Sequence, residues 1–475
     1  MQFTIYNVRC TILNPQFSIT PPVFTVHHSL FTIHCSLFTV HRSPNSQFSI
    51  NMSYTKNVSH NLLTQSLKLI LGTLTGIIVA RSLGPIGQGY TAYIILIFSL
   101  IGSFGHFGIT NAVAYYQKKS GFERSAIYNT NINLLILISG VLSLIIYVLY
   151  AGGLLLQGYT WPYLAGGLIL MISTLFTAHH QSWLMGDEKI IKGNRIALTV
   201  FFLKTACILL LWISGALNPF SFFMLTVAAI LLWFILIQST LGERYLPLLS
   251  LPVMKAEFSY GLIAWSSALF AYMHYRVDQL MIKQMLGVAD LGVYSIAVGI
   301  AELLFLFPVA INTALSGRLY NLEPGSESRK LVSNTLRISI LICAILCLIG
   351  FGGSFLIPLV YGSPYAEGTA LMQILLPGVL FACLPKLLSP WWFSSGRPKV
   401  HLWITFLCLL MNLGLNICFI PLWGSRGAAL ASSLSYIFYG LYYLLLMRFK
   451  EGFSFPDLLL LNRQDLHNMK GLLKR

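Results

Sequence analysis

The stretch NINLLILISGVLSLIIYVLYAGGLLL, residues 131–156, contains no charged side chain over 26 residues. A helix rises about 1.5 Å per residue, so this stretch is long enough to cross the roughly 30 Å apolar core of a bilayer. Apolar runs inside soluble cores are usually only about 10–14 residues long. The segment therefore predicts a transmembrane helix.

Eleven further stretches of the same kind follow one another along the chain, separated by charged or Gly/Pro-rich points. They lie near residues 62–80, 91–116, 161–184, 195–214, 219–241, 258–283, 292–316, 333–357, 369–395, 399–420 and 426–447. Of all 475 residues, 56% are apolar and 9% are charged, whereas an ordinary soluble domain has about 25% charged residues. We predict an all-α polytopic membrane protein with about twelve transmembrane helices.

Positive charge collects on alternate loops. If the amino terminus is inside, the even-numbered loops contain fourteen Lys and Arg residues and the odd-numbered loops three, namely Arg81, Lys283 and Arg426. The tail from Arg448 onward adds six cations to the even-numbered side. Because cytoplasmic loops are enriched in Lys and Arg, we expect both termini to be cytoplasmic.

The net charge of +16 would suggest a nucleic-acid partner in a soluble protein. Here the cations lie between apolar segments, so we interpret them as topology signals beside anionic lipid and expect no nucleic-acid binding. The cysteines lie mostly in apolar runs without a CxxC pair, which argues against a metal site. No GxSxG, HExxH or GxxxxGK[ST] motif is present, so we expect neither enzymatic activity nor a cofactor.

The amino-terminal region contains three consecutive heptapeptides between residues 24 and 44, FTVHHSL, FTIHCSL and FTVHRSP. A seven-residue period is too short for a solenoid unit. We interpret residues 1–51 as a non-native or disordered extension and Met52 as the start. The alternative is a His-rich metal-binding arm, but no carboxylate or close Cys/His set completes a site.

Two turns indicate that the chain consists of two similar halves. The turn after the first helix reads LGPIGQGY, residues 83–90, and the turn after the seventh reads LGVADLGVY, residues 286–294. Both occur at the same point of two six-helix sets with the same orientation, which is a known plan of transporters. We therefore expect an N-lobe at 52–241, a cytoplasmic linker at 242–257, a C-lobe at 258–447 and a cytoplasmic tail at 448–475.

Four cations lie inside the expected spans: Lys68, Lys204, Arg276 and Lys386. Each costs about 2.5–3.5 kcal/mol at mid-membrane on insertion scales, so each requires a partner or water. Arg276 lies near the outer end of its helix and could extend to the surface. The three lysines lie deeper and are candidates for contact with a substrate.

Polar side chains form stripes at helical spacing on the first, second and eleventh helices. Candidate cavity residues are Gln65, His106, Asn111, Asn412 and Asn416. Such stripes either join helices or line water. Three stripes together with deep cations favour an aqueous cavity.

The seventh and eighth helices contain two acidic residues at depth. Trp265, Tyr272, Arg276 and Lys283 fall on one face of the seventh helix, and Asp278 lies on another. Asp278 could neutralise a neighbouring cation, and Glu302 is either an ion-pair partner or a site for a coupling ion. On the tenth helix, three prolines predict bending beside a cavity.

Three segments resemble the polysaccharide-exporter, Wzx-type flippases of the multidrug/oligosaccharidyl-lipid/polysaccharide (MOP) superfamily. They are VARSLGPIGQGY at 79–90, YRVDQLM at 275–281 followed by Glu302, and SGRPK at 395–399 followed by GSRGAA at 424–429. The resemblance implies a MATE-like fold of two six-helix lobes that alternate access around a cationic cavity in a bacterial inner membrane. It also implies an undecaprenyl-pyrophosphate oligosaccharide substrate, such as an O-antigen or exopolysaccharide unit. H⁺ or Na⁺ as coupling ion and polysaccharide-assembly proteins as partners follow from the same resemblance.

Two other functions compete with this one. A multidrug exporter of the same superfamily would share the architecture, but it usually has an acidic, aromatic cavity for organic cations. A membrane glycan polymerase or ligase would be expected to carry a large external loop with functional Arg or His. The external loops here are short, and deep lysines outnumber deep carboxylates.

Overall fold

The computed structural model describes residues 44–119, 121–187, 189–319, 325–395 and 397–460, and every regular element in those ranges is a helix. The chain divides into the units Met1–Lys56 and Asn57–Arg475, of which the second contains α1 from Asn57 onward and all the later helices. The heptapeptide repeat lies outside the described residues, and the start at Met52 stays a prediction.

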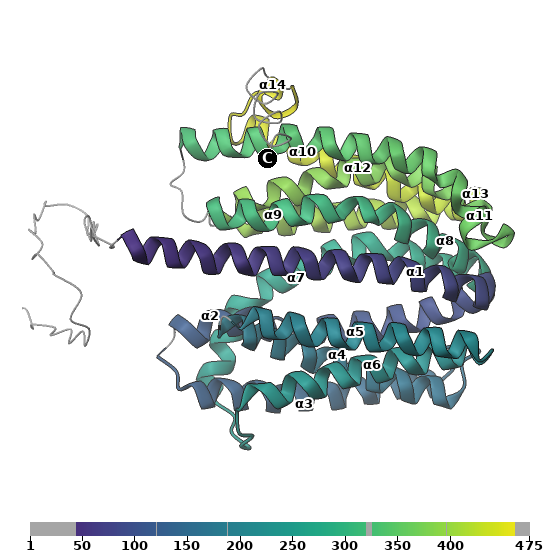
Figure 1. Ribbon diagram of the computed structural model, residues 1–475, viewed down its shortest axis with the longest axis horizontal. Helices are drawn as coiled ribbons and strands as arrows, with labels where there is room; N and C mark the ends of the chain where they lie inside the picture. The colour runs from purple at the N-terminus through teal and green to yellow at the C-terminus, as the bar shows by residue number, and fades with distance from the viewer. Residues whose placement is uncertain (1–43, 120, 188, 320–324, 396, 461–475) are drawn as a thin grey trace, which may run out of the picture. The chain divides into compact units, whose positions relative to one another are not determined.

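The helices of the first half reproduce the expected spans. They are α1 (Pro44–Phe104), α2 (Ile109–Lys119), α3 (Arg124–Ala151), α4 (Trp161–Gly186), α5 (Ile190–Ile213) and α6 (Pro219–Leu241) (Figure 1). α1 contains the first expected span and most of the second, divided by a kink at Gly84, where φ is +63°. Glycine adopts such a backbone conformation without the steric penalty of a side chain.

The second half begins with one long helix and ends with another. Its elements are α7 (Leu251–Met285), α8 (Val288–Ala301), η1 (Glu302–Phe305), α9 (Leu306–Leu319), α10 (Ser326–Gly353), η2 (Ser354–Leu356), α11 (Ile357–Tyr361), η3 (Ser363–Tyr365), α12 (Glu367–Ser394), α13 (Pro398–Phe449) and α14 (Phe455–Leu459). α13 is kinked at Gly424 and combines the last two expected spans. α7 starts at Leu251 and so includes the end of the expected linker.

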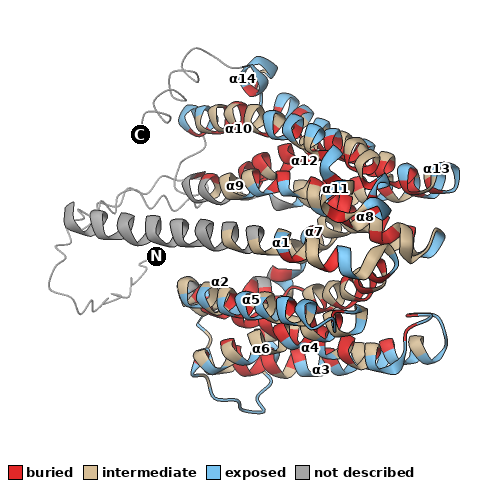
Figure 2. Cartoon of the chain, turned by 45° about the vertical axis from the view of Figure 1, so that its right-hand side comes forward, coloured by how far each residue is buried: buried red, intermediate tan, exposed pale blue. Residues whose placement is uncertain are grey.

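Nine described helical segments are long and apolar enough to cross a membrane. Two of them, Leu71–Phe104 and Lys399–Phe449, each contain parts of two expected spans, and α7 provides the seventh span. Leucines on the outer faces of α3, α5 and α10 are 63–73% exposed, as residues facing lipid should be (Leu144, Leu210, Leu348) (Figure 2). The twelve-helix prediction is therefore confirmed.

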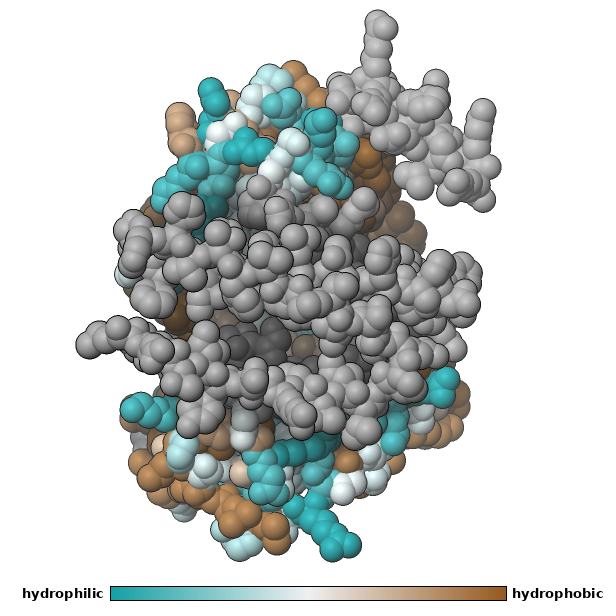
Figure 3. Space-filling model, turned by 90° about the vertical axis from the view of Figure 1, so that its left-hand side faces the viewer, coloured by the Kyte–Doolittle hydropathy of each residue, from teal (hydrophilic) through white to brown (hydrophobic). Residues whose placement is uncertain are grey.

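The helices are joined at two faces, which we name by their loops. The even-loop face contains the ends of the helices that the even-numbered loops join (α2 with α3, α4 with α5, α6 with α7, α9 with α10 and α12 with α13), and the odd-loop face contains the turns at Gly84, Gly158, Gly215, Gly287, Gly362 and Gly424. Hydrophilic residues gather on the even-loop face (Figure 3). There Arg124 binds Asp187 and Glu243, and the guanidinium lowers the pKa of Asp187.

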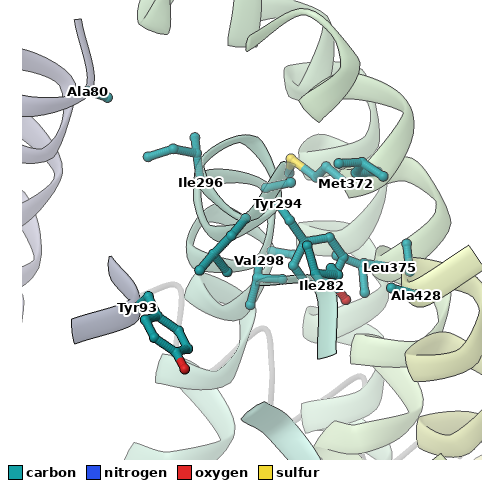
Figure 4. Packing of buried hydrophobic residues seen from close by; sticks show 14 of the residues in the cluster. Ala80, Tyr93, Ile282, Tyr294, Ile296, Val298, Met372, Leu375 and Ala428 are labelled. Atoms are coloured by element: carbon teal, nitrogen blue, oxygen red, sulfur yellow. The ribbon is translucent and has the colours of Figure 1, made fainter. Parts of the chain in front are cut away.

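α7 belongs to both halves of the packing. Near its start, Val253 packs in a core with residues of α2, α3, α4 and α6. Near its end, Ile282 packs in a second core with Tyr294 of α8, Leu375 of α12 and Ala428 of α13 (Figure 4). α7 thus connects an N-lobe to a C-lobe.

The two similar turns seen in the sequence contact each other at the odd-loop face. A Cβ on Gly89 would lie 1.6 Å from the Val288 carbonyl oxygen, and a Cβ on Gly292 would lie 1.9 Å from that of Pro85. Arg81 Nε donates to the Val360 carbonyl at 2.6 Å, and the Tyr365 hydroxyl donates to that of Ala80 at 2.9 Å. Close backbone packing therefore closes this face between the lobes.

Replacing Gly89 by Ala should lower the free energy of unfolding by about 1–3 kcal/mol, the usual penalty for overpacking. The new methyl group would collide with the Val288 backbone, which has no flexible end to move aside. Unfolding by SDS titration in mixed micelles would measure the loss.

Gly140→Ala is the matched control, because a Cβ at this helical position meets nothing within 4 Å. It should be as stable as the parent or more stable by up to about 1 kcal/mol. Equal stabilities of the two variants would contradict the close contact between the turns.

Candidate functional site

The deepest ion pair of the described chain joins α7 to the one-turn helix η1. Arg276 Nη1 and Nη2 bind Glu302 Oε1 and Oε2 at 2.8 and 2.7 Å, and their side chains are 24% and 20% exposed. A bidentate pair satisfies both charges geometrically. The sequence allowed Arg276 to extend to the membrane surface, but it instead pairs with Glu302 inside the protein. Of the two roles considered for Glu302, the structure shows that of an ion-pair partner.

Lys386 of α12 lies beside this pair but does not join it. Its Nζ is 4.6 Å from the ring centroid of Tyr275 and 4.2 Å from that of Phe305. It forms no ion pair with a carboxylate of the described residues. Aromatic faces stabilise a cation without neutralising it. The group of Arg276, Glu302 and Lys386 therefore keeps a net positive charge at membrane depth.

The backbone around Lys386 is arranged by a proline. Pro390 has no N–H to donate to the carbonyl of Lys386 four residues earlier, and the Asn312 side chain of α9 donates to that carbonyl instead. α12 remains one continuous helix through Pro377, Pro385 and Pro390, and the bending that we expect at these prolines stays a prediction. Neighbouring helices commonly satisfy freed backbone groups in this way.

One face of α7 contacts the second span of α1. Trp265 Nε1 donates to the Phe104 carbonyl at 2.8 Å, Tyr272 packs on the Phe104 ring, and Lys283 lies over the Tyr93 ring at 4.7 Å. Arg276 shares this face, as predicted from helical spacing. The Arg276–Glu302 pair thus lies on the side of the C-lobe that faces the N-lobe.

Further along the same two helices, a groove separates the lobes. It has a volume of about 430 Å³ and is lined by Tyr93, Ile97, Leu100, Ile101, Leu280, Met281 and Gln284. Leu280 and Gln284 lie one and two turns after Arg276 on α7. An apolar groove therefore begins next to the charged group.

Asp278 lies on the opposite side of α7, in the C-lobe interior. Its carboxylate accepts hydrogen bonds from the Tyr294 hydroxyl at 2.6 Å, the Ser432 hydroxyl at 2.7 Å and the Gln279 amide at 2.7 Å. Asn412 donates to Ser435 at 2.8 Å, and Asn416 donates to Asn412. All of these groups are buried, and Asn416 Oδ1 has no partner among the described residues.

The remaining predicted residues lie elsewhere. His106 is buried at the break between α1 and α2, where its Nδ1 accepts from the Gly108 amide at 3.0 Å. Lys204 lines a separate N-lobe pocket with residues of α1 and α6. The side chains of Gln65, Lys68 and Asn111 lie outside the described part of the chain. The structure thus brings Arg276, Glu302 and Lys386 together, and it places Lys204 in the other lobe.

Sequence reasoning missed a buried carboxylate near the start of α7. Glu257 is fully buried and accepts from Asn131 of α3 at 3.1 Å, while its Oε2 has no partner in the described structure. We had assigned Glu257 to a linker because Lys255 and Pro252 precede it. An acidic residue directly before a long apolar run was the available signal.

Two family models match the chain. The polysaccharide biosynthesis protein model matches residues 54–316, and the MatE model matches residues 264–418. A putative O-antigen transporter of Shigella flexneri is 25% identical over 414 residues, which cover 81% of this chain and 96% of that protein. The capsular polysaccharide biosynthesis protein CapF of Staphylococcus aureus is 26% identical over 36% of this chain and 44% of its own length.

Solved structures of two transporters share the fold. The lipid II flippase MurJ in an inward closed conformation superposes with a TM-score of 0.67 at 19% identity, over 83% of this chain and 88% of that one. An inward-facing multidrug resistance MATE transporter of the MOP superfamily gives 0.62 at 14% identity, over 81% and 94%.

Glu302→Gln should lower the free energy of unfolding by about 3 kcal/mol, because it leaves the Arg276 guanidinium unpaired at depth beside a second cation, Lys386. Arg276→Met combined with Glu302→Met should recover most of this loss, because apolar replacement of a whole buried pair is often tolerated. SDS-induced unfolding of the single and double variants would measure both effects.

The pair Arg426–Glu367 provides the control, since its side chains are 60% and 47% exposed on the odd-loop face. Glu367→Gln should cost less than about 1 kcal/mol. Similar losses at Glu302 and Glu367 would show that the deep pair is no more important than a surface pair.

Proposed function

The chain belongs to the polysaccharide biosynthesis protein family, whose model matches more than half of it, and on this basis we propose that it flips an undecaprenyl-pyrophosphate-linked oligosaccharide. The protein is a multi-pass MOP-superfamily flippase of a bacterial inner membrane. We assign the O-antigen or exopolysaccharide repeat unit as cargo and the cytoplasm as the location of both termini.

The observation that carries the substrate assignment is the uncompensated charge of Lys386. A pyrophosphate is a polyanion, and its passage through a bilayer needs a cation that is not already neutralised. Lys386 meets this requirement, since two aromatic rings hold it and no carboxylate of the described residues pairs with it. Arg276 adds hydrogen-bond donors next to it while Glu302 prevents an excess of charge.

The apolar groove beside this group suits the lipid part of such a molecule. Its lining from Tyr93 to Gln284 is almost entirely hydrocarbon and aromatic, and it lies between the two lobes. A polyprenyl tail can remain in the bilayer while the phosphates contact Lys386 of α12 and its neighbour Arg276, which lies one turn before the groove residue Leu280 on α7. Movement of the lobes about α7 would then expose the charged group to one side of the membrane at a time.

A multidrug exporter of the same superfamily is the second candidate, favoured by the MatE match at 264–418. Such a transporter needs an available carboxylate for an organic cation. In the C-lobe, Glu302 is bound by Arg276 and Asp278 by three hydrogen-bond donors. Because these donors already bind both carboxylates, the C-lobe favours an anionic cargo over an organic cation.

Asp278 is the better of our two coupling-ion candidates. Glu302 is engaged by Arg276, whereas Asp278 has only neutral hydrogen-bond donors around it. Side-chain oxygens of Ser432, Asn412 and Asn416 lie in the same buried network, and Asn416 Oδ1 is unpartnered there. Oxygen-lined sites near the membrane midplane bind Na⁺ or H⁺ in secondary transporters.

Lys386→Met should reduce surface glycan by about tenfold or more, since a charged hydrogen bond to phosphate contributes about 1.5–3 kcal/mol. Lys386→Arg should retain part of the export because it retains the charge. Glycan staining of a strain that carries only the variant gene, with immunoblotting of the membrane fraction, gives the measurement.

Lys399→Met is the matched control, because Lys399 is an exposed lysine on the even-loop face. It should export normally. Normal glycan in both lysine variants would argue against Lys386 as the phosphate contact.

Asp278→Asn should remove a Na⁺-dependent rise in thermal stability while Glu302→Gln keeps it. A ligand that binds only the folded state stabilises it in proportion to its occupancy. Melting curves of purified protein in NaCl and in choline chloride at equal ionic strength test this. A rise that survives in Asp278→Asn, or a parent protein that responds to pH but not to Na⁺, would exclude Asp278 as a Na⁺ site.

A further inference from the structure

The N-lobe contains a largely apolar pocket with a few polar side chains, which is separate from the charged group around Lys386. It has a volume of about 210 Å³ and lies between α1, α5 and α6. Its lining includes Thr75, Gln88, Phe201, Lys204, Thr205 and Phe222. Among the described residues of that lining, the lysine is the only charged one.

Two polar groups in this pocket lack partners. Lys204 Nζ lies 5.4 Å from the centroid of the Phe222 ring and forms no ion pair with a described carboxylate. Gln88 Oε1 is buried without a hydrogen bond in the described structure. Lys204 is 14 residues from the start of α5 and 9 residues from its end, which places its Cα about 13 Å or more from either end. A deep, unneutralised ammonium beside an unpaired amide indicates a place for a ligand.

The size of the pocket limits what it can hold. Its volume equals that of about seven water molecules at about 30 Å³ each, and it is below the roughly 300–1,000 Å³ of sites for drug-sized ligands. One monosaccharide ring with its substituents has a volume of this order, whereas an oligosaccharide is too large for the pocket. Phe201 and Phe222 provide flat apolar surfaces, and Thr205 and Gln88 provide hydrogen-bonding groups.

The pocket is closed toward the odd-loop face. Val79, Ile208 and Leu217 form a small apolar core there, packed against Leu83, Leu211 and Phe222 among others. The headgroups of membrane lipids lie at the ends of the helices, and this core separates the pocket from them on that side. α1, which lines the pocket through Gly72, Thr75 and Gly76, also contacts the C-lobe through Ala80 and Arg81. The pocket therefore adjoins the boundary between the lobes.

We propose that the Lys204 pocket is a specificity subsite for one acidic sugar residue of the transported glycan. The ammonium of Lys204 pairs with the sugar carboxylate, Gln88 and Thr205 bind ring hydroxyls, and the Phe201 and Phe222 rings cover the apolar faces of the sugar. This inference rests on the proposed function, because it assumes a glycan cargo. It adds a site in the N-lobe that distinguishes acidic from neutral repeat units, separate from the phosphate contact at Lys386.

Purified protein in nanodiscs of zwitterionic phosphatidylcholine would be titrated with glucuronic acid and with glucose, and binding followed by ligand-observed NMR. The parent protein should bind glucuronic acid about tenfold or more tightly than glucose, which corresponds to about one charged contact. Lys204→Met should bring this ratio close to one, and Lys204→Arg should preserve a preference for glucuronic acid.

Gly76→Leu tests the pocket without removing its charge. A Cβ at Gly76 meets nothing within 4 Å, and leucine is a good helix former, so the variant should fold while its side chain fills the pocket. Gly140→Leu is the control, since Gly140 is exposed on α3 and its Cβ position is equally open. Binding of both sugars should weaken by about tenfold in Gly76→Leu and stay unchanged in Gly140→Leu.

An unchanged ratio in Lys204→Met, or unchanged binding in Gly76→Leu, would overturn the subsite. So would glucuronic acid binding that disappears when phosphatidylglycerol replaces phosphatidylcholine in the nanodiscs, because the pocket would then be a lipid site. Loss of glycan export in Lys386→Met with a failed Lys204 test would leave the proposed function intact. Normal export in Lys386→Met with a preserved sugar preference would instead count against the proposed function alone.

Discussion

A charge inside a bilayer must be paired, hydrogen-bonded or held in a polar space, and this requirement organises the interior of the protein. Arg276 and Glu302 neutralise each other, and Asp278 is surrounded by hydroxyl and amide donors. Lys386 and Lys204 differ from these three residues. Aromatic rings contact their ammonium groups, and no described carboxylate pairs with them. Among the described side chains at depth, the C-lobe thus has Lys386 and the N-lobe has Lys204 as a cation that no carboxylate pairs with.

The two lysines lie in different lobes, which suggests that each lobe binds a different part of the cargo. In the C-lobe, Lys386 lies with Arg276 next to an apolar groove, an arrangement that suits a phosphate attached to a lipid. In the N-lobe, Lys204 lies in a small pocket with aromatic and hydroxyl groups, an arrangement that suits a sugar. A cargo with a lipid phosphate at one end and sugars at the other has a chemistry that matches both.

Motion between the lobes depends on how they touch. Close backbone contacts join the two repeated turns at the odd-loop face, where glycines allow Gly89 and Gly292 to approach carbonyl groups of the other lobe. Near the even-loop face, Gly261 of α7 meets Gly108, and Tyr116 donates to the Ala256 carbonyl at 3.1 Å. α7 is continuous between its N-lobe and C-lobe packing. The alternating access that we propose therefore requires the glycine contacts to separate while α7 bends or pivots.

The sequence by itself determined the twelve spans, because the preference of a segment for lipid is a sum over neighbouring residues. It also indicated the two halves, through turns whose glycines permit the kink at Gly84 and the positive φ at Gly287. Helical spacing separated the face of α7 with Arg276 from the side with Asp278, and the structure keeps this separation.

Only the tertiary structure decided which deep groups meet. Lys68, Lys204 and Lys386 were equivalent as isolated cations in apolar runs, and nothing in their spacing placed Lys386 beside Arg276 or Lys204 in the other lobe. Glu257 precedes a long apolar run in the sequence, but only the start of α7 at Leu251 shows that it lies inside a helix and is buried. The physical reason is that ion pairs and pockets depend on the rotation and distance of helices relative to one another. Those quantities are set by packing between segments far apart in the chain, such as the glycine contacts of α1 with α8.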